Sequence, residues 1–156
     1  MKWRRAVAEP SQALPVVLLP ALASSSWAYP ALEVVHLMGL ALLLGNLVLV
    51  ELRVWGAART LDIGALSRLA LPLSLLGFGL MALSGMLMFA TQPAELLANR
   101  FFVWKLGLVT LAGGNAVLFH LRGGLQRLDA LARLQTVLSL GLWLAALVCG
   151  RWIAYA

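Results

Sequence analysis

Four long apolar stretches, separated by short polar connections, dominate the pattern of the chain. They cover residues 31–52, 69–90, 101–121 and 134–153. Each is long enough to cross a bilayer as a helix, which takes about 20 predominantly apolar residues. A helix satisfies its backbone hydrogen bonds internally, as a chain in lipid must. The pattern predicts an all-α fold, an integral-membrane four-helix bundle formed by residues 31–156 as one domain.

Successive spans run in opposite directions, so the connections alternate between the two membrane faces. The N-terminal segment, the connection near 91–100 and the C-terminus share one face, here called side A. The connections near 51–68 and 122–133 share the other face, side B. Most Trp and Tyr residues fall at the ends assigned to side A, as is typical of a membrane–water interface.

The first thirty residues follow a different pattern. Basic residues at positions 2, 4 and 5 precede a short apolar run, which is how a secretory signal peptide begins. Pro10, Pro15 and Pro20 interrupt any helix through this run. We expect residues 1–30 to form a short N-terminal interfacial segment, with a cleaved signal peptide as the alternative.

Composition agrees with a membrane protein and excludes a soluble enzyme. The 156 residues are 62% hydrophobic and 12% charged, whereas a soluble domain is about 45–50% apolar and about 25% charged. The net charge of +6 comes from basic residues at helix ends and in connections, where they contact lipid headgroups. The lipid bilayer, and not a nucleic acid, is therefore the expected partner. The single cysteine, Cys149, excludes a disulfide framework.

Polar side chains inside the spans are costly in lipid, so each is a hypothesis about function. An offset of 69 positions between the first and third spans places them in three layers at matching depths. The layers are His36 with Lys105, Asn46 with Asn115, and Glu51 with His120. Each set falls on one face of its helix. We expect these faces to look at each other or into a shared interior.

His36 is the candidate metal ligand. Glu33 lies one turn before it on the same face, where its carboxylate could accept the ring N–H and leave the other nitrogen free for iron. The alternatives are that His36 is a hydrogen-bonded anchor between helices and that Glu33 pairs with Lys105 or Arg100. His36 and His120 cannot share one iron, because fifteen residues of helix separate their layers by about 22 Å.

The other polar residues lie near the two ends of the bundle. His120 and Glu51 near side B are expected to form an interfacial salt bridge or a proton-binding pair, with a second metal site as the alternative. Arg151 returns to the layer of His36 and Lys105 at side A. Such an excess of positive charge needs an anion, such as a heme propionate or an acidic lipid headgroup, unless Arg151 extends to the interface.

Small residues are expected where helices approach closely. Gly77 and Ser84 lie on one stripe of the second span, and Gly107 and Gly114 lie on one stripe of the third. Such stripes let helix backbones come into contact. They could also leave room for a flat cofactor between the helices.

Several short motifs resemble a family of bacterial four-helix inner-membrane proteins of uncharacterised function. They are Ser26-Trp27-Ala28-Tyr29-Pro30, Glu33, His36 to Gly39, Gly45, Glu51-Leu52-Arg53, Asn115 to His120 and Gly150 to Tyr155. More distantly, the order of these residues resembles the HemJ-type protoporphyrinogen oxidases and the CopD-like membrane domain. The HemJ resemblance implies that His36 ligates heme and that the lysine in the third helix of that type corresponds to Lys105. The chain lacks the proline that HemJ-type proteins carry beside the arginine closing their first helix.

These observations combine into one functional expectation. We expect a bacterial inner (cytoplasmic) membrane protein that holds heme b through His36, in a pocket formed by Glu33, His36, Lys105 and Arg151 near side A. Its function would be electron transfer or redox chemistry, with a redox membrane partner or a second copy of the chain. The alternatives are a non-catalytic structural or accessory subunit, and a metal or solute transporter that uses Asn46 and Asn115.

Overall fold

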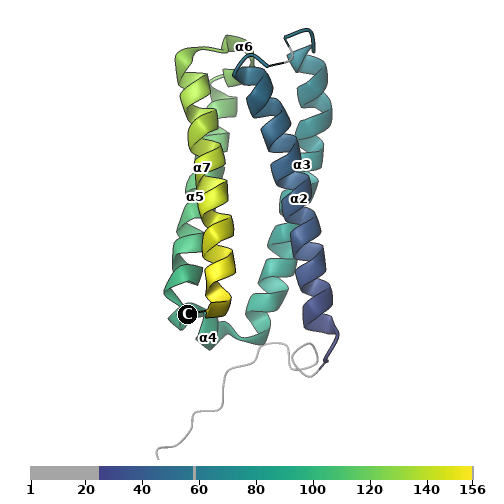
Figure 1. Ribbon diagram of the computed structural model, residues 1–156, viewed down its shortest axis with the longest axis vertical. Coiled ribbons are helices and arrows are strands. Elements are labelled where there is room, and N and C mark those ends of the chain that lie inside the picture. Colours follow the sequence, from purple (N-terminus) through teal and green to yellow (C-terminus); the bar gives the residue numbers. More distant parts are fainter. Residues whose placement is uncertain (1–24, 58, 156) are drawn as a thin grey trace, which may run out of the picture.

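Apolar sequence folds into four long helices in the computed structural model, which describes residues 25–57 and 59–155. The long helices are α2 (Ala28–Val54), α3 (Ile63–Thr91), α5 (Arg100–Leu121) and α7 (Ala130–Trp152). They run alternately up and down as one bundle, and the described residues contain no strand (Figure 1). The expected interfacial segment lies almost entirely outside the described residues.

All four helices are long and apolar enough to cross a membrane. Large apolar side chains such as Leu37, Leu75, Leu111 and Leu138 are at least half exposed on the outside of the bundle. In a membrane these side chains would contact lipid rather than a protein core. The predicted fold class, an all-α four-helix membrane bundle, is confirmed, and the protein is a multi-pass membrane protein.

Two helices begin earlier than their apolar stretches predict. The Asp62 carboxylate accepts a hydrogen bond from the Ala65 backbone at 2.6 Å and starts α3 at residue 63 rather than 69. The Asp129 carboxylate accepts one from the Ala132 backbone at 2.7 Å and starts α7 at residue 130 rather than 134. Aspartate at this position satisfies backbone N–H groups that the first helical turn leaves free.

Short elements complete the connections. Helix α4 (Pro93–Ala98) lies at side A, helix α6 (Gly124–Arg127) lies at side B, and the 3-10 turn η1 (Ile153–Tyr155) follows α7. The Asn99 side chain ties two of these regions together, because its amide donates to the Ile153 carbonyl at 3.0 Å. This hydrogen bond links the connection between α4 and α5 to η1 at side A.

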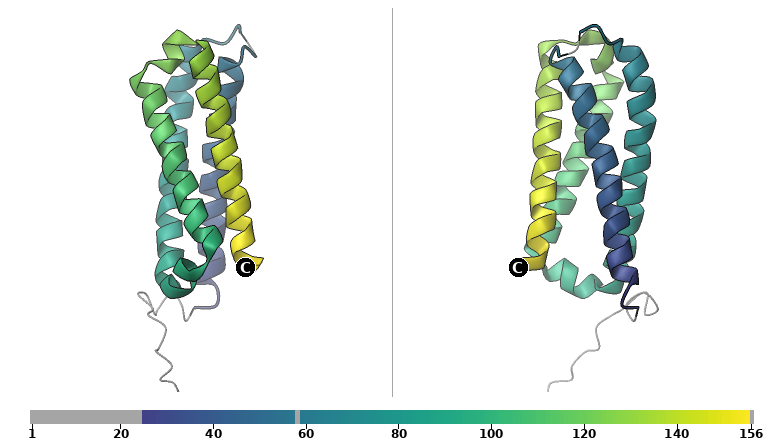
Figure 2. Two further views of the ribbon diagram at one scale, coloured as in Figure 1. Left: turned by 90° about the vertical axis from the view of Figure 1, so that its left-hand side faces the viewer. Right: turned by 45° about the vertical axis from the view of Figure 1, so that its right-hand side comes forward.

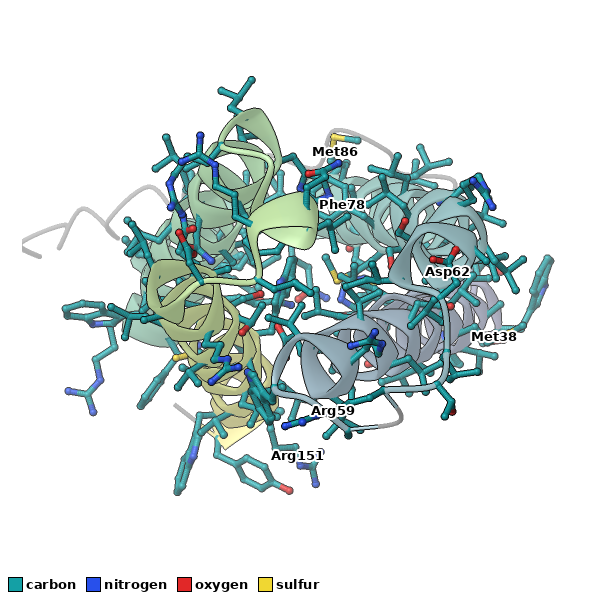
Figure 3. The ribbon with its side chains drawn as sticks, turned by 90° about the horizontal axis from the view of Figure 1, so that it is seen from above. Met38, Arg59, Asp62, Phe78, Met86 and Arg151 are labelled. Carbon is teal, nitrogen blue, oxygen red and sulfur yellow. The ribbon has the colours of Figure 1, made fainter. Side chains whose placement is uncertain are left out.

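The helices are arranged as two antiparallel hairpins. Helix α2 packs along α3, helix α5 packs along α7, and the hairpins meet mainly through α2 and α7. Figure 2 shows the two pairs from two further directions. Helices α2 and α5 are therefore diagonal in the bundle (Figure 3), rather than neighbours as direct pairing of their polar layers would require.

Glycine sets the distance between α2 and α3. A Cβ atom on Gly77 would lie 2.6 Å from the Leu43 nitrogen and 2.7 Å from the Gly39 carbonyl oxygen. A Cβ atom on Gly39 would lie 2.7 Å from both the Gly77 oxygen and the Met81 nitrogen. The two backbones are thus in direct contact, as small residues permit in membrane helices.

One side chain from each long helix meets at the middle of the bundle. Leu43, Met81, Ala112 and Trp143 form this buried cluster. Phe78 of α3 adds an edge-to-face contact with the Trp143 ring, with 6.3 Å between the ring centroids. This layer separates the polar groups near side A from those near side B, while Met38 and Arg151 point outward (Figure 3).

Candidate functional site

His36 lies in the contact between α2 and α3, toward side A. Its Nδ1 atom is 3.2 Å from the Ser84 Oγ atom on α3. The Ser84 hydroxyl is directed at the Leu80 carbonyl oxygen, 2.6 Å away. Because the hydroxyl proton is donated to that carbonyl, the Ser84 oxygen is left to accept, and Nδ1 of His36 is the donor. The lone pair of the neutral imidazole is then on Nε2.

Glycine also makes room for the His36 ring. A Cβ atom on Gly85 would lie 3.3 Å from the His36 Cε1 atom, so a side chain there would press on the imidazole. Ser84 is 2% exposed, and the His36 side chain is half-buried. The ring is therefore held by one hydrogen bond and one close contact, both from α3. A metal-binding imidazole needs this kind of support.

Ser84, and not Glu33, is the hydrogen-bond partner of the His36 ring in the structure. Glu33 is exposed and forms no hydrogen bond among the described residues. Ser84 is buried opposite His36 because α2 and α3 are antiparallel and Gly39 fixes their register beside Gly77 and Met81. One helical turn closer to side A, the same register places His36 of α2 beside Ser84 of α3. The contact of Gly39 with Gly77 is the feature that would have identified Ser84 as the partner of His36.

Lys105 of α5 lies on the opposite corner of the bundle. Its side chain is half-buried, and its Nζ atom is 3.4 Å from the position that a Cβ atom on Gly150 of α7 would occupy. The Lys105 ammonium is within electrostatic range of the His36 imidazole. The structure therefore brings His36 and Lys105 toward a shared interior, although their helices are diagonal.

Arg151 does not join this pair. Its side chain is exposed, donates a 2.5 Å hydrogen bond to the Tyr155 hydroxyl and lies over the Tyr155 ring at 4.9 Å. The expected four-residue pocket is thus not formed, since both Glu33 and Arg151 face outward. Arg151 matches the alternative of a cation that extends to the interface, where arginine and tyrosine are both common.

The middle polar layer is not a shared layer. The Asn46 amide donates to the Leu42 carbonyl of its own helix at 2.7 Å. The Asn115 amide donates to the Gln135 carbonyl of α7 at 2.8 Å. Each asparagine side chain donates to backbone, and the two do not bond to each other. Diagonal placement of α2 and α5 explains why the two do not meet.

The expected pair of Glu51 and His120 near side B is also wrong. His120 is exposed, and its Nδ1 atom lies 2.8 Å from the Ala116 carbonyl of its own helix. Glu51 is 2% exposed, and neither of its carboxylate oxygens has a hydrogen-bond partner. Ser139 of α7 lies close enough to the Glu51 carboxyl to influence it, whereas the His120 side chain is exposed. The two side chains are therefore in different surroundings.

Among the glycines of the expected stripes, only Gly77 is in a close helix contact. Gly107 and Gly114 have open space where a Cβ atom would be. A surface hollow of about 430 Å³ is lined by Glu95, Ala98, Asn99 and Arg100 beside α4, away from His36.

The donor set at His36 is a single imidazole. Residues 25–57 and 59–155 contain no group of three or more His, Cys, Asp or Glu side chains that could hold a metal ion. Heme supplies four ring nitrogens itself, so one imidazole nitrogen can be enough protein ligation. His36 offers that nitrogen, and Lys105 offers a positive charge for an acidic substituent.

Comparison of the chain with protein-family models, with curated proteins and with solved structures finds no match. The fold and the residues themselves therefore carry the functional argument.

Proposed function

We propose that the protein binds b-type heme through the Nε2 atom of His36 and serves electron transfer or redox chemistry in the membrane. The observation that carries this proposal is the hydrogen bond between His36 Nδ1 and Ser84 Oγ, at 3.2 Å. It directs the free imidazole lone pair away from α3 and fixes the ring. Partners of this kind raise the basicity of a ligating histidine and hold its orientation.

Two further residues would hold the group. Lys105 supplies a half-buried cation from the other hairpin, which would pair with a propionate carboxylate. Gly85 leaves the space that the His36 ring occupies against α3. Bound heme would supply reversible one-electron chemistry at its iron. The surrounding apolar side chains would exclude water and so tune the potential.

The proposal extends to the location and the partner. The resemblance stated above supports placement in a bacterial inner membrane, where electron carriers meet lipid-soluble or protein donors. Large apolar side chains cover the outside of the bundle, which is compatible with lipid, with a redox membrane partner or with a second copy of the chain.

An absorption spectrum of the purified protein tests the proposal. The full chain, expressed with a heme precursor and purified in mild detergent, should show a Soret band and sharp reduced α and β bands. His36→Ala should remove these bands, whereas His120→Ala should leave them. A folded, colourless protein that purifies with another membrane protein would favour an accessory subunit instead.

A further inference from the structure

Glu51 is the one ionisable side chain that is fully buried in the described part of the chain. It is 2% exposed and lies three residues before the end of α2, near side B. Both carboxylate oxygens are buried without a hydrogen-bond partner. An ionised carboxylate in such surroundings costs several kcal/mol unless a charge or several hydrogen bonds stabilise it. Glu51 therefore needs a proton, a counter-charge or further hydrogen bonds to stabilise it.

The charged side chains at this end do not provide one. They are Arg53 on α2, Arg59 in the connection that follows it, Asp62 and Arg68 at the start of α3, His120 and Arg122 at the end of α5, Arg127 on α6, and Asp129 and Arg133 at the start of α7. Arg122 pairs with Asp129 at 3.1 Å, the one ion pair formed within residues 25–57 and 59–155. Arg53 donates to the Leu61 carbonyl at 2.8 Å. The cations are thus directed at other acceptors or at the surface.

Two buried hydroxyl groups of α7 lie near the end of α2, Thr136 against Trp55 and Ser139 near Glu51. The Thr136 hydroxyl accepts from the Trp55 indole and donates to the Arg133 carbonyl, each at 2.8 Å, so its bonds are already formed. The Ser139 hydroxyl, 6% exposed, lies close enough to the Glu51 carboxyl to influence it. A carboxylic acid O–H at Glu51 could donate to the Ser139 oxygen, which a carboxylate could not do.

A proton suits this site better than a metal cation. Calcium takes six to eight oxygen ligands and magnesium demands an octahedral set, whereas Glu51 is a single carboxylate beside one available hydroxyl. One proton removes the whole charge by forming one O–H bond. We propose that Glu51 is a proton-binding site between α2 and α7, which takes its proton from water at side B and holds it at neutral pH.

This inference is independent of the heme proposal. Fifteen residues of helix, about 22 Å, separate Glu51 from His36, and the buried cluster at the middle of the bundle lies between them. Proton binding also has a structural consequence. Helices α2 and α7 form the main contact between the hairpins, so loss of the proton would place an unpaired charge in that contact.

Infrared spectroscopy of the full chain in detergent tests the proposal. A protonated carboxylic acid gives a C=O stretching band that shifts in D₂O, whereas an exposed glutamate is almost fully ionised at about pH 7. We expect the band at neutral pH in the parent protein. Glu51→Gln should remove it, and the matched variant Glu33→Gln, an exposed glutamate on the same helix, should keep it. Absence of the band at neutral pH in the folded parent protein would overturn the proposal.

Thermal unfolding provides a second readout that does not depend on any variant. The parent protein should lose stability as the pH rises above about 5, where an unfolded glutamate is already ionised, until the folded state also releases its proton. Glu51→Gln should flatten this dependence. Stabilisation by sodium chloride relative to choline chloride at neutral pH, with no acid band, would identify a cation site and overturn the proton assignment.

Discussion

The two hairpins of the bundle are held together in different ways. In α2 and α3 the backbones touch at Gly39 and Gly77, where no side chain fits. In α5 and α7 the contact is made by side chains instead, including the 2.8 Å hydrogen bond from Asn115 to the Gln135 carbonyl. The first hairpin is therefore fixed in spacing and register, whereas the second can adjust by moving side chains.

This difference gives the proposed heme site a rigid side and an adaptable side. His36 and Ser84 both belong to the glycine-linked hairpin, so their hydrogen bond depends on a register set by backbone contact. Lys105 belongs to the other hairpin, which meets the first mainly through α2 and α7. A ligand held on a rigid element keeps its geometry while the opposite side accommodates a ring.

The largest expected effect comes from adding one methyl group to the glycine contact. Gly77→Ala should destabilise the protein by about 3 kcal/mol, because the new Cβ atom would meet backbone atoms that cannot move alone. Gly79→Ala is the matched control, since that position is open, and better helix propensity should make it neutral or stabilising by up to about 1 kcal/mol. Unfolding in detergent measures both. Equal stabilities of the two variants would show that the backbones do not touch.

The next effect concerns the orientation of His36. Ser84→Ala removes the acceptor for the Nδ1 proton, so heme affinity should fall by about 10-fold to 100-fold. Ser74→Ala, on the same helix but away from His36, should leave affinity unchanged. Titration of the heme-free protein with heme measures the two dissociation constants. If Ser84→Ala binds as tightly as the parent protein, Ser84 does not orient the ligand.

A smaller effect should distinguish the two asparagines. Asn115→Ala removes a hydrogen bond between α5 and α7 and should cost about 1 kcal/mol. The Asn46 amide donates within its own helix, so Asn46→Ala should cost less. Unfolding of both variants in the same detergent makes the comparison. A larger loss for Asn46→Ala would mean that its side chain links helices after all.

The smallest effect is the acid sensitivity of the α7 N-terminus. The backbone N–H of Ala132, helped by the nearby Arg122 guanidinium, lowers the pKa of Asp129 below its ordinary value. Because the pKa of Asp129 is lower in the folded state, its stabilisation of the protein is complete above the unfolded-state pKa of about 4. This stabilisation is lost as the pH falls through the folded-state pKa. The melting temperature of Asp129→Asn should therefore vary less than that of the parent protein below about pH 4. An identical acid profile would contradict the role of Asp129.

The apolar pattern was sufficient to predict the fold. Four uninterrupted stretches indicated four spans, because lipid requires every backbone group within a span to be satisfied. The early starts of α3 and α7 were missed, because Asp62 and Asp129 act through single hydrogen bonds outside the apolar stretches. A helix end depends on such local polar contacts rather than on hydropathy.

The candidate site was less predictable, because it depends on which helices are neighbours. Depth along a helix correctly separated His36 from His120, but equal depth on α2 and α5 did not make their side chains partners. The antiparallel register of α2 and α3 decides that His36 meets Ser84. That register follows from the contact of Gly39 with Gly77, which became visible only in three dimensions.

Pulsed electron paramagnetic resonance of the ferric, heme-loaded protein with ¹⁵N-labelled histidine tests the central claim most directly. The sequence contains two histidines, so a ¹⁵N nucleus coupled to the iron must belong to His36 or His120. We predict strong coupling to one histidine nitrogen, which His120→Ala keeps and His36→Ala abolishes. Strong coupling that survives in His36→Ala, or loss of coupling in His120→Ala, would contradict the assignment of His36 as the ligand.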